Sequence, residues 1–166
     1  MDAWEQALGQ AAALGPDAPA EHIDRAVQEV LRLMREHLQM DVAFVSHLQQ
    51  GRRYFVTVDT REGAEVIGPG ESAPADESFC QRVIDGRLPQ CVQDARQLPD
   101  AASLPATPFP VGSHLSTPVV LGDGEVYGTL CCFSFEAARP LIERDLKRLR
   151  MAAGLTARLI DQRRRS

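Results

Sequence analysis

The chain has 166 residues, of which 44% are hydrophobic and 25% charged, values that fit one globular domain and argue against intrinsic disorder. A net charge of −5 argues against the basic surface of a nucleic-acid-binding protein, so we expect no nucleic-acid partner. The sequence has no apolar run of the roughly 18 residues that a membrane span needs, and its acidic N-terminus lacks the features of a signal peptide. We therefore expect a cytoplasmic protein with no membrane partner and with reduced cysteines.

Two segments with helical periodicity open the chain. Residues 1–14 carry Trp4 and Leu8 at helical spacing, and a run rich in glycine and proline follows them, which predicts a short helix and a linker within residues 1–20. Residues 21–39 place apolar side chains on one face of an expected helix and polar side chains on the other. We therefore expect an amphipathic helix over that second segment.

The pattern then changes to that of strands, in two pairs separated by an irregular middle. Residues 41–48 and 53–58 are rich in strand formers and flank a glycine-containing turn, while residues 113–121 and 125–134 flank the turn sequence Gly-Asp-Gly. Four prolines within residues 93–111 exclude a long regular element there. The remaining predicted elements are a polar loop at 60–77, a short helix at 78–85, a short strand at 90–92 and a long helix at 140–163.

This order of elements predicts an α+β fold. Two hairpins separated by an irregular insertion imply a central antiparallel sheet of five or six strands, with the terminal helices packed on one face. The segment 60–112 must then cross the other face, and a connection of that length is typically a lid over a binding site. We assign residues 21–162 to this single domain and residues 163–166 to a basic tail.

Four stretches of the sequence resemble the GAF family of sensory domains. They are DVAFVSHL at 41–48, DESFCQRVIDGRLP at 76–89, GSHLSTPV at 112–119 and GEVYGTLCCFS at 124–134. The resemblance extends over residues 21–160 and implies a GAF/PAS-like fold that binds a small molecule and regulates bacterial signal transduction without catalysis. It also implies a signalling output domain as a partner, and the sequence contains no motif of such a domain.

The resemblance and the expected strands together select seven residues for a ligand pocket. His114 and Ser116 share a face of one strand, where the histidine would anchor a polar or planar ligand; the alternative is a histidine satisfied by the lid backbone. The consecutive Cys131 and Cys132 must point to opposite faces of the sheet. The predicted ligand-binding residues are Phe44, Phe79, Cys80, Asp94, His114, Ser116 and Cys131. The sequence identifies neither the ligand nor a cofactor, and the absence of a CxxC pair argues against a metal site.

An enzymatic alternative comes from the free methionine-(R)-sulfoxide reductases, which are GAF-fold enzymes that use cysteines in the pocket. Such a reaction needs a thiolate to attack the sulfoxide sulfur and a second thiol to resolve the intermediate, and Cys80 and Cys91 are available for these roles. Those enzymes also carry a cysteine before the strand that corresponds to residues 112–119, whereas no cysteine lies between positions 92 and 130 here. We therefore expect a domain that is not an enzyme.

The terminal helices indicate a homodimer. The helix at 140–163 carries more apolar residues than one core-facing stripe needs, and Trp4 and Leu8 add apolar surface from the N-terminal helix. We expect these surfaces to pack against a second copy of the chain. A third alternative is a ligand-free dimerisation module whose pocket is filled by its own side chains.

Overall fold

The computed structural model describes residues 2–11, 13–137 and 139–165. Met1 and Ala12 of the expected N-terminal helix and Ser166 of the expected basic tail lie outside the described residues. The helices are α1 (Ala3–Ala11), α2 (Ala20–Leu38), α3 (Phe79–Ile84) and α4 (Glu143–Arg165), with short 3₁₀ helices η1 (Ala75–Glu77), η2 (Ala95–Gln97) and η3 (Ala101–Ser103). The strands are β1 (Val42–Gln49), β2 (Arg52–Thr60), β3 (Ser72–Pro74), β4 (Cys91–Val92), β5 (His114–Val120) and β6 (Val126–Phe133).

The strands form one six-stranded antiparallel sheet in the order β3-β2-β1-β6-β5-β4. The five strands expected from the sequence are present, each within two residues of its predicted ends, and β3 adds a short edge strand inside the segment predicted as a polar loop. The α+β fold with a sheet of five or six antiparallel strands is therefore confirmed.

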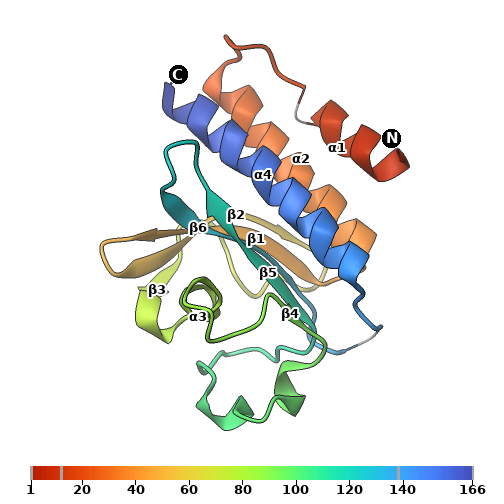
Figure 1. Cartoon of the computed structure of the whole chain (residues 1–166), viewed down its shortest axis with the longest axis vertical. Helices are drawn as coiled ribbons and strands as arrows, with labels where there is room; N and C mark the ends of the chain where they lie inside the picture. Colours follow the sequence, from red (N-terminus) through yellow and green to blue (C-terminus); the bar gives the residue numbers. More distant parts are fainter. Residues whose placement is uncertain (1, 12, 138, 166) are drawn as a thin grey trace.

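Helices α2 and α4 run antiparallel across one face of the sheet, and α1 lies against α2 (Figure 1). The apolar stripe of α2 faces the sheet because residues three and four apart share one side of a helix. These helices and that face of the sheet form one aliphatic cluster, which we call the helix-side core. Its fully or almost fully buried members include Ile23, Val30, Leu31, Met34, Leu38, Ala43, Val45, Leu115, Leu130, Cys132 and Leu149.

The N-terminal helix is part of this core. Trp4 and Leu8 are only 7% and 1% exposed because they pack into the helix-side core within the chain. The expectation that these two residues supply apolar surface for a second copy is therefore wrong. Ile142, directly before α4, and Met151 on α4 are the large apolar side chains of this region that remain exposed.

Two features set the limits of α4. The Asp145 carboxylate accepts a hydrogen bond from the backbone N–H of Ile142 at 2.9 Å, so the helix begins at Glu143 instead of Pro140. At the other end the helix continues to Arg165, so the described part of the expected basic tail is helical. None of the helices in the described ranges combines the length and the apolar character needed to cross a membrane.

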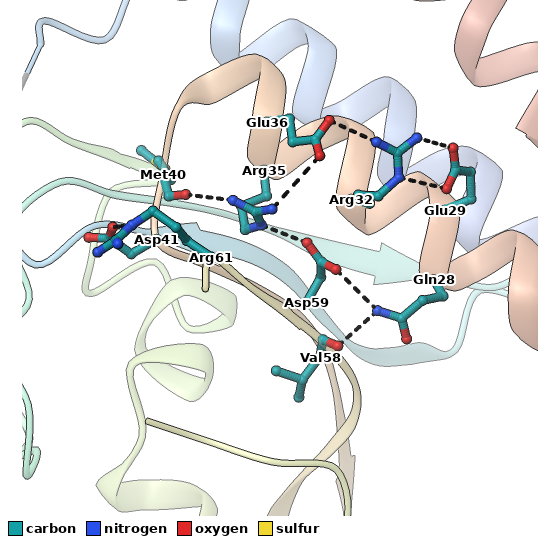
Figure 2. A network of polar contacts seen from close by, with 10 residues as sticks. All are labelled: Gln28, Glu29, Arg32, Arg35, Glu36, Met40, Asp41, Val58, Asp59 and Arg61. Carbon is teal, nitrogen blue, oxygen red and sulfur yellow. Dashed lines mark hydrogen bonds and ion pairs between the residues drawn. The ribbon is translucent and has the colours of Figure 1, made fainter. Parts of the chain in front are cut away.

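A network of polar contacts fastens α2 to the edge of the sheet (Figure 2). Arg35 on α2 donates to the Asp59 carboxylate on β2 at 2.6 Å, and both side chains are less than one-fifth exposed. Gln28 donates to the Val58 carbonyl at 2.9 Å, one helical turn away from a second group of ion pairs around Arg32. These contacts hold the orientation of the helix over β2, where apolar packing is sparser than at the sheet centre.

The opposite face of the sheet is covered by α3 and by the chain around η1, η2 and η3 (Figure 1). All six phenylalanines of the sequence pack on this side, whereas the helix-side core contains none. They are Phe44, Phe55, Phe79, Phe109, Phe133 and Phe135. The two faces of the sheet therefore differ in the kind of side chain they bury.

Candidate functional site

The candidate site lies on the lid-facing side of the three central strands. Cys131 on β6 stands directly between Phe44 on β1 and Ser116 on β5. Two residues further along β6, Phe133 pairs with His114 on β5. We call this surface, together with Ser46, Arg53, Cys80 and Thr129 described below, the lid-side site. It brings together the predicted residues Phe44, Phe79, Cys80, His114, Ser116 and Cys131.

A β-bulge decides which residues of β2 reach this site. Val45 pairs with Thr57 but the next residue, Ser46, pairs with Phe55, so Val56 is an extra residue in the ladder. An extra residue reverses the faces of the residues before it, because side chains alternate along a strand. Phe55 and Arg53 are consequently turned to the lid side.

A chain of hydrogen bonds crosses the floor of the site. The Thr129 backbone N–H donates to Ser46 Oγ at 3.0 Å, and the Thr129 hydroxyl donates to Cys80 Sγ at 3.1 Å. The Ser46 hydroxyl is 2.8 Å from Thr129 Oγ1 and is the donor there, because the Thr129 proton is already used toward Cys80. This chain fixes α3 to the sheet through Cys80 and leaves these polar groups satisfied.

Both thiols of the site are protonated. Burial raises the pKa of the Cys80 thiol, although hydrogen bonds from Ser46 and Thr129 and the charge of Arg53 oppose that shift. Burial also raises the pKa of Cys131 well above its ordinary value, and the neighbouring thiols add to the effect. A thiol is a good nucleophile only as the thiolate, so neither cysteine has the ionisation state of a reactive group.

His114 is a buried, neutral imidazole. Burial lowers its pKa to about 4, so the ring carries no charge at neutral pH. Its Nε2 lies 3.3 Å from Cys131 Sγ. When the thiol donates to Nε2, the ring proton resides on Nδ1. Nδ1 is buried and has no hydrogen-bond partner among the described residues.

Two further polar groups of the site lack partners. The Ser116 hydroxyl is fully buried, has the Cys131 thiol as a weak hydrogen-bonding neighbour, and forms no hydrogen bond to an oxygen or nitrogen atom within the described ranges. Arg53 places its guanidinium 3.8 Å from the centroid of the Phe55 ring, and its buried Nε is likewise unpartnered there. Leaving such a group unpaired costs about 1–3 kcal/mol, so three of them together make this surface the candidate functional site.

Two aromatic side chains separate the site from a vestibule of about 480 Å³. Phe79 lies against His114 with ring centroids 5.2 Å apart, and Phe109 stacks on Phe133 at 5.3 Å. Phe79 and Phe109 also line the vestibule, which is otherwise bounded by the segment from Ala95 to Val111. Rotation of these two rings would connect the vestibule to the buried polar groups.

Asp94 and Cys91 lie apart from the site. Asp94 caps η2 through the Arg96 backbone N–H at 3.1 Å and forms an ion pair with the Arg96 side chain, so it does not join the other six predicted residues. Cys91 on β4 pairs with Leu115 and packs against the helix-side core. The sheet therefore separates Cys91 from Cys80.

A second cavity, of about 550 Å³, lies on the other face of the sheet. It is bounded by the sheet, the N-terminal half of α2 and the C-terminal end of α4. His47 and Tyr127 stack at 3.9 Å on its wall, and Val56 and Arg164 also line it. Sequence reasoning found neither this cavity nor Arg53. An arginine two residues before Phe55 in a strand was the available signal, but strand alternation alone hides the effect of the bulge.

In the described part of the chain no group of three or more His, Cys, Asp or Glu side chains could hold a metal ion.

Comparison with known proteins agrees with this architecture. The chain is 27% identical over 148 residues to the diguanylate cyclase DgcP of Escherichia coli, an alignment that covers 87% of this chain and 42% of that protein. Its fold resembles the GAF domain of an Acinetobacter phosphoenolpyruvate-protein phosphotransferase (TM-score 0.74, 14% identity, 99% and 97% of the two chains). It also resembles the free methionine-R-sulfoxide reductase of Neisseria meningitidis, solved with its substrate (TM-score 0.71, 14% identity, 98% and 90%). The family model described as GAF domain matches residues 20–161, and the chain therefore belongs to the GAF domain family.

Proposed function

We propose that this chain is a non-catalytic regulatory domain that binds a small molecule at the lid-side site in bacterial signal transduction. The observation that carries the proposal is the set of buried groups without hydrogen-bond partners in the described residues, Arg53 Nε, His114 Nδ1 and Ser116 Oγ, beneath a lid. A core built only for stability would pair or replace such groups, because each lowers the free energy of unfolding. A ligand that forms hydrogen bonds with these groups would gain binding free energy from them.

Regulation would follow from opening and closing of the lid. Ligand entry requires Phe79 and Phe109 to move away from His114 and Phe133, and ligand contacts would then favour the closed lid. Closure of the lid would shift β5 and β6, and α4 packs against these strands on the other face of the sheet. The terminal helices would pass this change to an output domain. Similarity to part of a diguanylate cyclase supports such a domain arrangement.

Two further properties belong to the proposal. A homodimer would form through the terminal helices, and the exposed Met151 of α4 and Ile142 directly before it are apolar side chains available for the contact. The protein would act in the cytoplasm. Size-exclusion chromatography with light scattering tests the dimer, and Met151→Glu should reduce association while leaving the fold intact because the side chain is 41% exposed.

The reductase alternative is favoured by the fold likeness to a free methionine-R-sulfoxide reductase. Three observations weigh against it. Cys80 and Cys91 lie on opposite sides of the sheet, and the thiols facing the lid are held protonated by burial. The sequence also lacks a cysteine between positions 92 and 130. Turnover of free methionine-(R)-sulfoxide by the purified protein with a thioredoxin system, lost in Cys80→Ser, would replace the regulatory proposal by the enzymatic one.

Native mass spectrometry and a thermal-shift screen against nucleotides, amino acids, organic acids and tetrapyrroles test for a ligand. A matched pair of variants locates it: His114→Phe changes the lid-side site, and His47→Phe changes the helix-side cavity. We expect a ligand-induced rise in Tm that is lost in His114→Phe and kept in His47→Phe. The reverse result would move the site to the helix side, and a protein that no compound stabilises would favour the ligand-free dimerisation module.

A further inference from the structure

Arg53 is a partly buried cation of the lid-side site. It takes part in none of the ion pairs formed by the described residues, whereas Arg35 and Arg61 nearby are each paired with an aspartate. Its Nε is buried against Phe55, and Glu71 is the carboxylate that acts on it at longer range. An arginine remains charged even when it is partly desolvated. The lid-side site therefore contains one positive charge and, because its thiols are protonated, no negative one.

The hydrogen-bonding groups of the site are unbalanced in the same direction. Arg53 Nε–H is a donor that finds no acceptor in the described part of the chain, and His114 Nδ1 is a second one in the tautomer in which Nε2 accepts from Cys131. Ser116 adds a hydroxyl that can also donate. The acceptors of the floor, Ser46 Oγ and Thr129 Oγ1, are already engaged with each other. A ligand that complements this site must therefore bring acceptors and negative charge.

The surroundings of Arg53 also limit the rest of the ligand. Phe44 meets the Phe55 ring edge-on at 4.8 Å and lies 6.5 Å from Phe133, so aromatic side chains extend from Arg53 across the sheet centre. Arg53 reaches the site from β2 and His114 from β5, with Phe44 between them. A body that lies on these rings would be apolar and preferably aromatic.

We infer that the ligand of the lid-side site is a small organic anion, an arene or other apolar body bearing a carboxylate whose oxygens pair with Arg53. This inference rests on the proposed function, that the lid-side site takes a ligand. The carboxylate accepts hydrogen bonds from the guanidinium in a charge-assisted pair. The apolar body lies over Phe44 and Cys131, with Ser116 and His114 at its far end.

The test compares 3-phenylpropionate with its neutral amide, 3-phenylpropionamide, by isothermal titration calorimetry. The two probes share shape and arene and differ in charge. The variants are Arg53→Gln, Arg53→Lys and, as a matched control, Arg52→Gln, whose exposed guanidinium contacts Ser72 Oγ at 3.0 Å instead of the site. We expect the carboxylate to bind the native protein at least tenfold more tightly than the amide. That preference should persist in Arg52→Gln, weaken in Arg53→Lys and disappear in Arg53→Gln.

The outcomes separate the inference from the proposed function. Equal binding of amide and carboxylate by the native protein, with loss of both in His114→Phe, would overturn the anionic ligand and leave the lid-side site as a binding site. Undiminished carboxylate preference in Arg53→Gln would also overturn the role of Arg53. Circular dichroism of each variant excludes unfolding as the cause of a loss. If no compound in the wider screen stabilises the native protein, the proposed function fails and the inference fails with it.

Discussion

The two faces of the sheet bury different chemistry. The helix-side core is aliphatic and contains residues such as Leu115, Leu130 and Leu149 at 0% exposure. The lid face packs all the phenylalanines, three of them buried, together with hydroxyl, thiol, imidazole and guanidinium groups. Of the five buried side-chain polar atoms without partners in the described residues, three belong to the lid-side site, one, Arg82 Nε, to the lid helix α3, and one, Trp4 Nε1, to the helix-side core. The helix side supplies stability, whereas the unpaired groups of the lid side reduce stability and, on the proposed function, serve binding.

The largest effect expected from this contrast comes from neighbouring residues of β6. Leu130 points into the helix-side core and Cys131 into the lid-side site, and both are fully buried. Leu130→Ala should lower the free energy of unfolding by about 2–5 kcal/mol, because it leaves a cavity in an aliphatic core. Cys131→Ala should cost about 1 kcal/mol. Urea denaturation measures both, and a larger loss for Cys131→Ala would reverse the assignment of the stabilising face.

The second prediction uses the pH dependence of stability. The folded pKa of His114, about 4, lies below its ordinary value of 6.5, so the unfolded chain takes up the proton first as the pH falls. Stability is therefore fully present above pH 6.5 and is lost toward pH 4. Between pH 7 and pH 5 the native protein should lose about 2 kcal/mol from this group.

The control for this pH effect is a variant pair on the two faces. His114→Phe should remove that part of the slope and His47→Phe should retain it, as read from urea midpoints at both pH values. An unchanged slope in His114→Phe would mean that the lid admits water to the ring. The contrast between a dry lid face and solvent would then be weaker than the structure indicates.

Two buried serines of the lid face test whether unpaired groups cost stability. Ser46 accepts from the Thr129 backbone N–H, so Ser46→Ala leaves that donor unpaired and should cost about 1–3 kcal/mol. Ser116 has no partner in the described ranges, and Ser116→Ala should leave stability within about 1 kcal/mol of the native value or raise it. Thermal unfolding of both variants gives the difference. A loss in Ser116→Ala equal to that in Ser46→Ala would show that its hydroxyl is paired.

The smallest effect is a difference in the rate of thiol modification. Cys91 is partly exposed and should react first with iodoacetamide, as followed by peptide mass spectrometry. Cys80 and Cys131 should follow, because the lid of short 3₁₀ helices and loops opens more easily than the layer of α2 and α4. Cys132, beneath the long helices, should react last. Modification of Cys132 before Cys131 would contradict a mobile lid over a stable helix layer.

Much of the fold could be predicted because long periodic patterns determine it. The stripe of α2 and the alternation of β5 and β6 correctly predicted the layers, and adjacency alone predicted that Cys131 and Cys132 face opposite ways. The strand β3 was missed because three residues are too few for a pattern. The seven site residues remain a prediction as ligand contacts, although six of them gather at one place. Asp94 was selected by its type, and only the structure shows that its carboxylate is engaged by Arg96.

The bulge at Val56 has a consequence for how the domain can diverge. Because one extra residue turns Arg53 and Phe55 toward the lid, a strand of the same sequence without the bulge would present Val56, Tyr54 and Arg52 there instead, whereas deleting Val56 would keep the pairing of Ser46 with Phe55. The helix-side core would keep most of its members, since α2, α4, β5 and β6 are unaffected. A flattening of the bulge would thus exchange the chemistry of the site at once, whereas a one-codon deletion at Val56 would preserve it.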